Sequence, residues 1–243
     1  MMVVTEHSEI GAIVAANPRA AAVFEKYGID FCCRGNRPLD TVSRERGVDT
    51  AEILAALSNC PDASAATAPR FATWSIDLLT SYIEENHHRY IREAAPILRE
   101  HTAKIAKVHG RNHPELLVIA RTFAQLSDDL EQHMIKEERI LFPLMRELAA
   151  AARHARTVPG PAGQLPSPDG PIAVMMQEHQ QAGDDMAAIR KLSQDYAAPA
   201  DGCATYRACF QELADFEHDL HDHVHLENNL LFPRALALEA EGA

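Results

Sequence analysis

One sequence pattern occurs twice in the chain and constrains the fold more than any other feature. The stretch HMIKEERILFP begins at His133, and HVHLENNLLFP begins 90 residues later at His223, with no gap inside the match. Histidine, glutamate, phenylalanine and proline hold the same places in both copies. A repeat of this kind indicates a duplicated structural unit.

Both copies belong to long helical patterns. Of the 243 residues, 47% are hydrophobic and only 11 are glycine, a composition that favours helices over sheet. Helical periodicity predicts four long segments, at residues 75–108, 115–150, 170–195 and 203–240. The prolines and glycines of VPGPAGQLPSPDGP predict a long crossover loop between the second and third segments. Two similar helix pairs predict an all-α fold built on a four-helix bundle.

The part of the chain before the bundle has a different character. Residues 1–60 contain several short helical patterns and predict a small helical domain, which holds the adjacent pair Cys32 and Cys33. The stretch CPDASAATAPR follows, and its alanine, serine and proline content predicts a linker at residues 61–74. The bundle is then expected at residues 75–240.

The repeated histidine and glutamate fall on the apolar faces of their helices. In the second predicted helix, His133 and Glu137 continue an apolar stripe formed by Phe123, Leu126, Leu130, Ile140, Leu141 and Leu144. In the fourth, His223 and Glu227 continue the stripe of Leu213, Phe216, Leu220, Leu230 and Leu231. Residues spaced by three and four share one helix face, so polar side chains are predicted inside the core in both halves.

A metal site explains these polar residues better than packing does. A single histidine on an apolar stripe is usually a hydrogen-bonded core residue, whereas an unpaired buried carboxylate is costly and rare. A histidine and a glutamate four residues apart have Cβ atoms roughly 5–6 Å apart, close enough to bind one cation or a pair. Because this combination occurs twice at equivalent positions, metal binding is favoured.

The facing helices are expected to supply the remaining ligands. The third helix offers His179 in the stretch VMMQEHQQAGDDM. In the first helix, the periodicity from Ile83 points to His87, whereas an offset of 91 residues from His179 points to His88, and the spacing leaves both open. Four histidines and two glutamates without a thiolate suit a first-row metal. Two carboxylates shared between two ions favour a pair of iron ions, although manganese and zinc also use such ligands.

Charge and hydropathy exclude several classes of partner. The formal net charge of −12 argues against nucleic acid and against an anionic membrane surface, because both require clustered lysine and arginine. The apolar runs fall far below the ~20 residues of a bilayer span, and the N-terminal MMVVTEHSEI lacks the features of a signal peptide. Five cysteines suit a reducing compartment better than a disulfide framework. We therefore expect a cytoplasmic protein that binds neither nucleic acid nor membrane.

Cys32 and Cys33 form a second candidate site. The positive charges of Arg34 and Arg37 are expected to favour the thiolate and raise its reactivity, which indicates redox or iron-handling chemistry. The alternative is two small buried residues in a tight turn. The other cysteines are predicted to pack as small apolar residues: Cys60, Cys203 and Cys209. The histidines outside the polar stripes are predicted to be exposed to solvent: His101, His109, His113, His218 and His225. Secondary metal binding is the alternative for His218 and His225.

These segments together resemble the repair of iron centres family. The resemblance rests on the two repeats, on HHRYIREAAP and GPIAVMMQEH in the first and third helices, and on YGIDFCCRGNRPL near the N-terminus, and it covers nearly the whole chain. Members are two-domain, hemerythrin-like di-iron proteins that help to restore iron–sulfur clusters damaged by nitric oxide or oxidants. The resemblance implies two histidines per iron with both glutamates bridging, through the ligands His88, His133, Glu137, His179, His223 and Glu227.

The resemblance also implies what the site does. The two non-haem iron ions would be carboxylate-bridged, with an oxo bridge when oxidised, and would keep positions open for nitric oxide or oxygen. Glu178 is expected to line a route to them, and Cys32 and Cys33 to take part in the repair chemistry. Damaged iron–sulfur proteins are the expected partners, with a homodimer as one possible assembly. Two alternatives stay open: a di-iron sensor of nitric oxide or oxygen, and a nitric oxide reductase or peroxidase supplied by an external electron donor.

Overall fold

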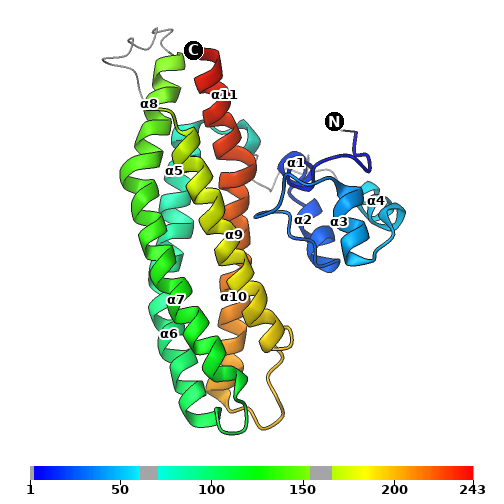
Figure 1. Cartoon of the computed structure of the whole chain (residues 1–243), viewed down its shortest axis with the longest axis vertical. Coiled ribbons are helices and arrows are strands. Elements are labelled where there is room, and N and C mark those ends of the chain that lie inside the picture. The colour runs from blue at the N-terminus through cyan, green and yellow to red at the C-terminus, as the bar shows by residue number, and fades with distance from the viewer. Residues whose placement is uncertain (1–2, 61–70, 154–165, 243) are drawn as a thin grey trace.

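The chain is helical throughout the part that the structure describes. A computed structural model describes residues 3–60, 71–153 and 166–242, which contain helices and one isolated bridge between Glu9 and Pro38 but no strand. Four long helical rods lie side by side, and short N-terminal helices pack beside them (Figure 1). The predicted all-α fold, a four-helix bundle preceded by a small helical domain, is confirmed. No helix within the described ranges is long and apolar enough to cross a membrane.

The rods follow the predicted helical segments closely. A short 3₁₀ helix, η1 (Phe71–Thr73), precedes the first rod. The first rod is α5 (Ile76–Tyr82), η2 (Ile83–His88) and α6 (Arg89–His109); the second is α7 (Glu115–Lys136), η3 (Glu137–Leu141) and α8 (Phe142–Arg153). The third is α9 (Asp169–Leu192), and the fourth is α10 (Ala204–Leu226), η4 (Glu227–Leu231) and α11 (Phe232–Gly242). In the predicted crossover loop, residues 158–165 lie outside the described ranges.

The N-terminal helices are short and have defined ends. They are α1 (Ile10–Ala16), α2 (Ala20–Lys26), α3 (Leu39–Arg46) and α4 (Thr50–Ser58). The side chain of Asp49 caps α4 by accepting a hydrogen bond from the amide of Ala51. Gly47 ends α3 with a φ of 68°, a left-handed conformation that glycine adopts at little cost. Of the predicted linker at 61–74, residues 61–70 lie outside the described ranges.

Three rods contain a π-helical turn where the repeated polar residues lie. The segment η2 ends at His88, whereas η3 begins at Glu137 and η4 begins at Glu227. A π-turn inserts one residue into an α-helix, and such turns occur frequently at functional sites. Pro143 and Pro233 follow η3 and η4 closely. Since proline has no amide hydrogen to donate to the preceding turn, it favours a change of register there.

The change of register explains which residues of two predicted stripes face inward. Ile83 and His88 are both fully buried although they are five residues apart, because η2 spans the interval between them. An unbroken α-helix would place His87, four residues after Ile83, on that face. The prediction that Ile140 is buried is wrong. Ile140 is 60% exposed and Leu141 is buried in its place, because η3 moves the stripe on by one residue.

The apolar core is divided into two clusters. One holds Ile91, Leu130, Ala182 and Leu220 from the four rods, together with N-terminal residues such as Phe24 and Phe31. The other holds Ile83, Leu141, Met175 and Leu230 from the four rods. Along every rod the polar stripe residues fall between these two sets. A polar layer therefore crosses the bundle between two apolar ones, and it must satisfy its own charges there.

The N-terminal helices contact the fourth rod closely. The ring of Phe31 meets the imidazole of His225 edge-on, with centroids 5.6 Å apart, and the side chain of Asn229 donates to the carbonyl oxygen of Phe31 at 3.2 Å. A Cβ atom at Gly11 or Gly35 would lie 2.1 or 2.5 Å from Asn229 Oδ1, so both positions require glycine for this approach. The prediction of a solvent-exposed His225 is wrong, because the N-terminal helices cover it and leave it 7% exposed.

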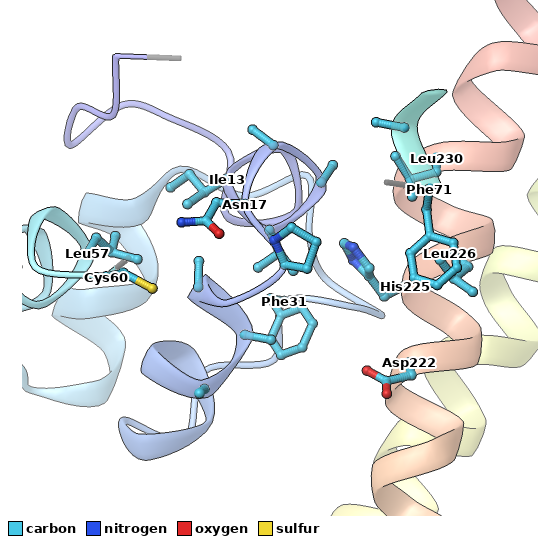
Figure 2. Close-up of a pocket in the computed structure, with 18 of the residues that line it drawn as sticks. Ile13, Asn17, Phe31, Leu57, Cys60, Phe71, Asp222, His225, Leu226 and Leu230 are labelled. Atoms are coloured by element: carbon cyan, nitrogen blue, oxygen red, sulfur yellow. The ribbon is translucent and has the colours of Figure 1, made fainter. Parts of the chain in front are cut away.

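A cavity of about 1190 Å³ lies beside this contact (Figure 2). Its lining is mostly apolar and comes from the N-terminal segment, η1, the first rod and the fourth rod, with Ile13, Phe31, Leu57, Phe71 and Leu226 among the contributors. His225 and Asp222 add polar groups to its wall. The six predicted metal ligands do not line this cavity. The candidate chemistry therefore lies in the polar layer of the bundle and not in this cavity.

Candidate metal centre

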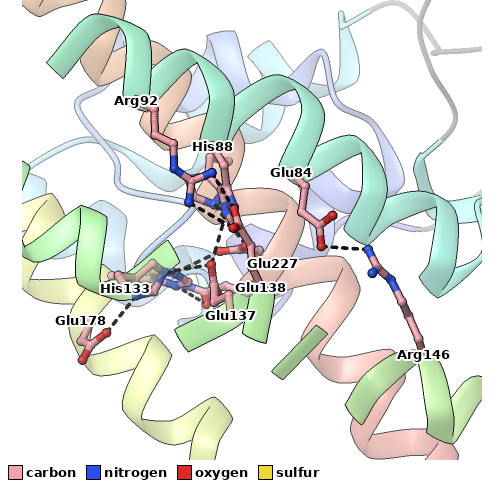
Figure 3. A network of polar contacts seen from close by, with 12 residues as sticks. Glu84, His88, Arg92, His133, Glu137, Glu138, Arg146, Glu178 and Glu227 are labelled. Atoms are coloured by element: carbon pink, nitrogen blue, oxygen red, sulfur yellow. Dashed lines mark hydrogen bonds and ion pairs between the residues drawn. The ribbon is translucent and has the colours of Figure 1, made fainter. Parts of the chain in front are cut away.

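The structure brings the six predicted ligands together inside the bundle. All six side chains are buried, with exposures of 2% or less. Their donor atoms form two groups, each within 4.8 Å, and both glutamates belong to both groups. The first group is His88, Glu137, His223 and Glu227; the second is His133, Glu137, His179 and Glu227. Figure 3 shows His88 of the first rod, His133 and Glu137 of the second and Glu227 of the fourth converging on one place.

The spacing of the imidazole nitrogens fits two bound ions. Nε2 of His133 lies 3.0 Å from Nε2 of His179, and Nε2 of His88 lies 3.2 Å from Nε2 of His223. Two imidazoles on one first-row ion, with metal–nitrogen bonds of about 2.1 Å and an ordinary angle between them, hold their nitrogens ~2.9–3.4 Å apart. Each pair of histidines therefore has the separation that one shared ion requires.

Three of the four histidines are oriented by an acceptor on the side away from the cluster. Nδ1 of His88 donates to Glu138 at 2.8 Å, and Nδ1 of His133 donates to Glu178 at 2.9 Å. Nδ1 of His179 donates to the side-chain oxygen of Asn228 at 2.9 Å. With the proton on Nδ1, the lone pair of Nε2 faces the cluster, which is the tautomer a metal ligand needs.

Two of these orienting residues were not singled out in the sequence, although the repeat contains a signal for them. Glu138 and Asn228 each directly follow a repeated glutamate, and both offer an oxygen acceptor at that place. Arg92 fixes Glu138 with hydrogen bonds of 2.8 and 3.1 Å (Figure 3). The equivalence of the two positions shows that the duplication extends to the partners of the histidines.

Glu178 lies next to the cluster but outside it. Its carboxylate accepts hydrogen bonds from His133 and from the ammonium group of Lys136, and its side chain is 35% exposed. Both partners favour the ionised carboxylate, His133 most strongly, and the pKa of Glu178 is lowered to about 2. Through this hydrogen bond, Glu178 holds the imidazole ring of His133 in its orientation.

The electrostatics of the cluster keep both buried carboxylates ionised. Burial and the charge of Glu227 raise the pKa of Glu137, but the imidazoles of His133 and His88 lower it by more. The pKa of Glu137 therefore falls below its usual value. The pKa of Glu227 is likewise lowered, because His223 and His179 outweigh burial. Burial lowers the pKa of His133, but the surrounding carboxylates raise it to about 10. Protonated imidazoles thus balance the charge of the buried carboxylates, and a metal cation at the same place would balance it instead.

The donor set fits a metal for a second reason. Neither carboxylate oxygen of Glu137 has a hydrogen-bond partner among the described residues, although the side chain is fully buried; its Oε2 has only ion-pair contacts of 3.3 Å with Nε2 of His88 and of His133. Leaving the oxygens of a buried carboxylate without hydrogen bonds is costly, so native proteins rarely do so. Imidazole and carboxylate without thiolate are the ligands of first-row divalent metals such as iron. The residues present therefore fit a pair of such ions.

His87, the alternative first-helix ligand, stands outside the cluster. Its Nδ1 lies 3.0 Å from the carboxylate of Asp219, and its ring stacks on His223 with centroids 5.6 Å apart and planes 6° apart. Its position in the repeat corresponds to that of Glu178. Glu178 accepts the Nδ1 proton of His133, whereas His87 stacks and leaves Nδ1 of His223 without a hydrogen-bond partner among the described residues. The two halves of the site differ at this point.

The structure also corrects the expectation for Cys32 and Cys33. Both are free thiols near the cluster, but the arginines expected to activate them are engaged elsewhere. Arg34 pairs with Asp184 at 3.0 Å, and Arg37 pairs with Glu45. The hydrogen bond with Cys33, burial and the charge of Asp30 raise the pKa of Cys32 well above its usual value. Arginine therefore does not make Cys32 a thiolate.

The remaining cysteines and histidines divide differently from the prediction. Cys209 is buried, as expected, but Cys203 is exposed at the start of α10, with its sulfur 3.3 Å from Nε2 of His109. The three histidines expected in solvent at this end of the bundle are half-buried and have polar partners: His101 with Glu212, His109 with Cys203, and His113 with Asp201. His218 is exposed, as predicted.

Comparison with known proteins gives a consistent result along the chain. Residues 80–235 match the hemerythrin HHE cation binding domain, and residues 6–60 match ScdA_N, a domain of unknown function. All six cluster residues lie in the first match, and Cys32 and Cys33 lie in the second. The first match indicates a metal-binding domain, typically one for iron.

Curated relatives match nearly the whole chain. The iron–sulfur cluster repair protein YtfE of Musicola paradisiaca (strain Ech703) is 36% identical over 231 residues, covering 95% of this chain and 97% of the relative. The iron–sulfur cluster repair protein ScdA of Staphylococcus haemolyticus (strain JCSC1435) is 30% identical over 229 residues, covering 94% and 98%. YtfE of Edwardsiella ictaluri (strain 93-146) is 34% identical over 233 residues, covering 93% and 96%. The chain therefore belongs to the family of the iron–sulfur cluster repair proteins, with a hemerythrin HHE cation binding domain.

Proposed function

We propose that this protein repairs iron–sulfur clusters damaged by nitric oxide or by oxidants, in the cytoplasm, with a di-iron site in its bundle. The observation that carries the proposal is the direct contact between the two candidate sites. Cys33 Sγ donates to the backbone carbonyl of His179 at 3.3 Å, and the carbonyl of Cys32 accepts from Asn228, which also holds the ring of His179. An iron–sulfur cluster consists of iron and sulfide and is held by cysteine thiolates, and this chain places ligands suited to iron against a pair of thiols.

The six buried side chains have distinct roles in the proposed site. His88 and His223 would hold one iron, and His133 and His179 the other. Glu137 and Glu227 belong to both groups and would bridge the ions. When bound, the two iron ions supply redox-active metal centres that can take nitric oxide or oxygen as a ligand, as well as iron itself.

The protein's own residues hold this site ready. Hydrogen bonds from three Nδ1 atoms to Glu138, Glu178 and Asn228 fix the ring planes before metal enters. The two apolar clusters on either side of the polar layer exclude water from it. Two histidines and two carboxylates per ion leave coordination positions free, since iron commonly accepts more than four ligands.

The test is the recovery of a damaged client. An iron–sulfur enzyme inactivated by nitric oxide is incubated anaerobically with this protein, whose iron content has been measured, and its activity is followed against an equal amount of free iron. We expect recovery beyond the free-iron control with the wild type, and none beyond it with the Glu137→Gln variant. No recovery from wild-type protein that carries two irons would overturn the proposal and favour gas binding or reduction at the same site.

A further inference from the structure

Three donor groups converge in the loop between α2 and α3. The side-chain oxygen Oδ1 of Asp30 accepts hydrogen bonds from the amides of Cys32 and Cys33, at 3.1 and 2.9 Å. The same oxygen lies 3.2 Å from Sγ of Cys32. The carboxylate and the two sulfurs all lie within 4.8 Å of one another. The local turn therefore fixes one carboxylate and two thiols around a common point.

The distance between the two sulfurs excludes a disulfide bond and is compatible with a shared metal ion. Sγ of Cys32 lies 3.7 Å from Sγ of Cys33, whereas a disulfide bond needs about 2.0 Å. Two thiolates on one tetrahedral ion, with metal–sulfur bonds of about 2.3 Å, lie ~3.8 Å apart. The observed separation matches the edge of such a tetrahedron.

The bundle is shaped to accommodate this pair. Gly183 on α9 faces Cys33, and a Cβ atom there would lie 2.8 Å from the sulfur. Glycine in the middle of a helix costs roughly 0.5–1 kcal/mol relative to alanine, and here it makes room for the thiol. Two small residues that only filled space would require neither a carboxylate aimed at them nor a glycine opposite.

We propose that Asp30, Cys32 and Cys33 bind one divalent first-row metal ion, in a site separate from the cluster of histidines and glutamates. Two sulfurs and one carboxylate oxygen suit iron, cobalt or zinc, and disfavour magnesium and calcium. Binding displaces the two thiol protons, so that two thiolates and one carboxylate surround the ion, and a fourth position stays open. No electron is transferred in this step.

The thiol site contacts the proposed di-iron centre at His179, one of the proposed ligands of that centre. The thiol of Cys33 donates to the backbone carbonyl of His179, while Asn228 joins the carbonyl of Cys32 to the imidazole of His179. An ion held by the thiols would therefore lie beside His179, a proposed ligand of the two buried iron ions. The use of this thiol site as a transfer point for iron rests on the proposed function. The binding of a metal ion at the thiol site does not depend on that function.

Cobalt(II) titration of the full-length protein under anaerobic conditions tests the proposal. Cobalt bound to thiolate gives charge-transfer absorption in the near ultraviolet, which cobalt on histidine and carboxylate does not give. We expect this absorption in the wild type, with three tightly bound ions per chain. The Cys32→Ser/Cys33→Ser variant should keep two ions and lose the absorption. The control Cys60→Ser/Cys203→Ser should keep all three ions and the absorption.

Two further variants keep the test independent of folding. Asp30→Asn can still accept the amide hydrogen bonds and should weaken the third ion at least tenfold, because it removes a charged ligand. Gly183→Ala changes no ligand but displaces Cys33, and should weaken the same ion. Absence of thiolate absorption in the wild type, or its persistence in Cys32→Ser/Cys33→Ser, would overturn the proposal. Neither readout uses a client enzyme, so failure here is distinct from failure of repair.

Discussion

Glu138 and Asn228 occupy equivalent positions in the two repeats, and each accepts the Nδ1 proton of a histidine on a facing helix. Glu138 holds His88 at 2.8 Å, and Asn228 holds His179 at 2.9 Å. One of the two acceptors is charged and fixed by Arg92, while the other is neutral and tied to the backbone of Cys32. The duplication thus preserved the orientation of the ligands, while one half of the site became linked to the N-terminal thiols.

Replacing a bridging carboxylate should remove iron without unfolding the bundle. Glu137→Gln keeps the size of the side chain but removes a charged donor shared by both groups, so iron content should fall below two per chain. Helical content measured by circular dichroism should be unchanged. The control is Glu147→Gln on the exposed surface of α8, which should retain two irons. Two irons in the Glu137 variant would contradict its assignment as a bridge.

The same variant should also reduce the stabilisation that iron provides. Ligand binding raises the free energy of unfolding by about 4 kcal/mol where free ligand exceeds its dissociation constant a thousandfold. Chelating iron from the wild type should therefore lower its thermal midpoint, whereas the midpoint of Glu137→Gln should change little. Differential scanning calorimetry with and without chelator measures both.

His88 and His87 should differ sharply when each is replaced by alanine. His88→Ala removes a donor of the cluster and should cost at least one tightly bound iron. His87→Ala removes a ring that stacks on His223 and pairs with Asp219, but no donor of the cluster, and should keep two irons. Metal analysis of both purified variants decides the matter. Loss of iron from His87→Ala alone would show that the π-turn had been misinterpreted.

Glu178 should affect metal affinity through the ring that it holds. Glu178→Ala removes the acceptor of His133 Nδ1, and loss of such an outer partner typically weakens metal binding 10–100-fold. Glu84→Ala is a matched control, because Glu84 pairs with Arg146 at 2.9 Å and is similarly half-buried, but touches no cluster residue (Figure 3). Iron affinity is measured by competition with a chelator. Equal weakening in both variants would indicate a general loss of stability instead.

Cys203 should be the most reactive thiol at neutral pH. The hydrogen bond with His109 and the first amides of α10 lower its pKa to about 7, whereas burial raises the pKa of Cys209 to about 12. The thiolate is the nucleophile, so alkylation of Cys203 should accelerate as pH rises through about 7 and then level off. Mass spectrometry after timed iodoacetamide treatment gives the rate at each cysteine.

The partner of that thiol supplies the control. His109→Ala removes the first cause of the lowered pKa, so the midpoint of Cys203 alkylation should move up towards ~8.5. The alkylation rate of Cys60 should be the same in both proteins. An unchanged midpoint for Cys203 would mean that His109 does not set its reactivity.

The sequence predicted the bundle because helical periodicity and the repeat are local signals. His133, Glu137, His223 and Glu227 could be placed in the core because they continue apolar stripes. The first-helix ligand could not be chosen by spacing, because a π-turn breaks the period that spacing assumes. Ile140 was misplaced for the same reason.

Other errors came from contacts that are distant in the sequence. The burial of His225 depends on Phe31 and the N-terminal helices, almost 200 residues away. Arg34 pairs with Asp184 on the third rod and not with the thiols. No local pattern contains either pairing, whereas Glu138 and Asn228 could have been found by comparing the two repeats position by position.

The location of iron in a crystal of the iron-loaded protein tests the central claim most directly. Anomalous scattering measured at the iron absorption edge should give two peaks within the bundle. One should lie between His88 and His223 and the other between His133 and His179, with Glu137 and Glu227 touching both. A single peak, or a peak bound by His87 in place of His88, would contradict the proposed two-iron site.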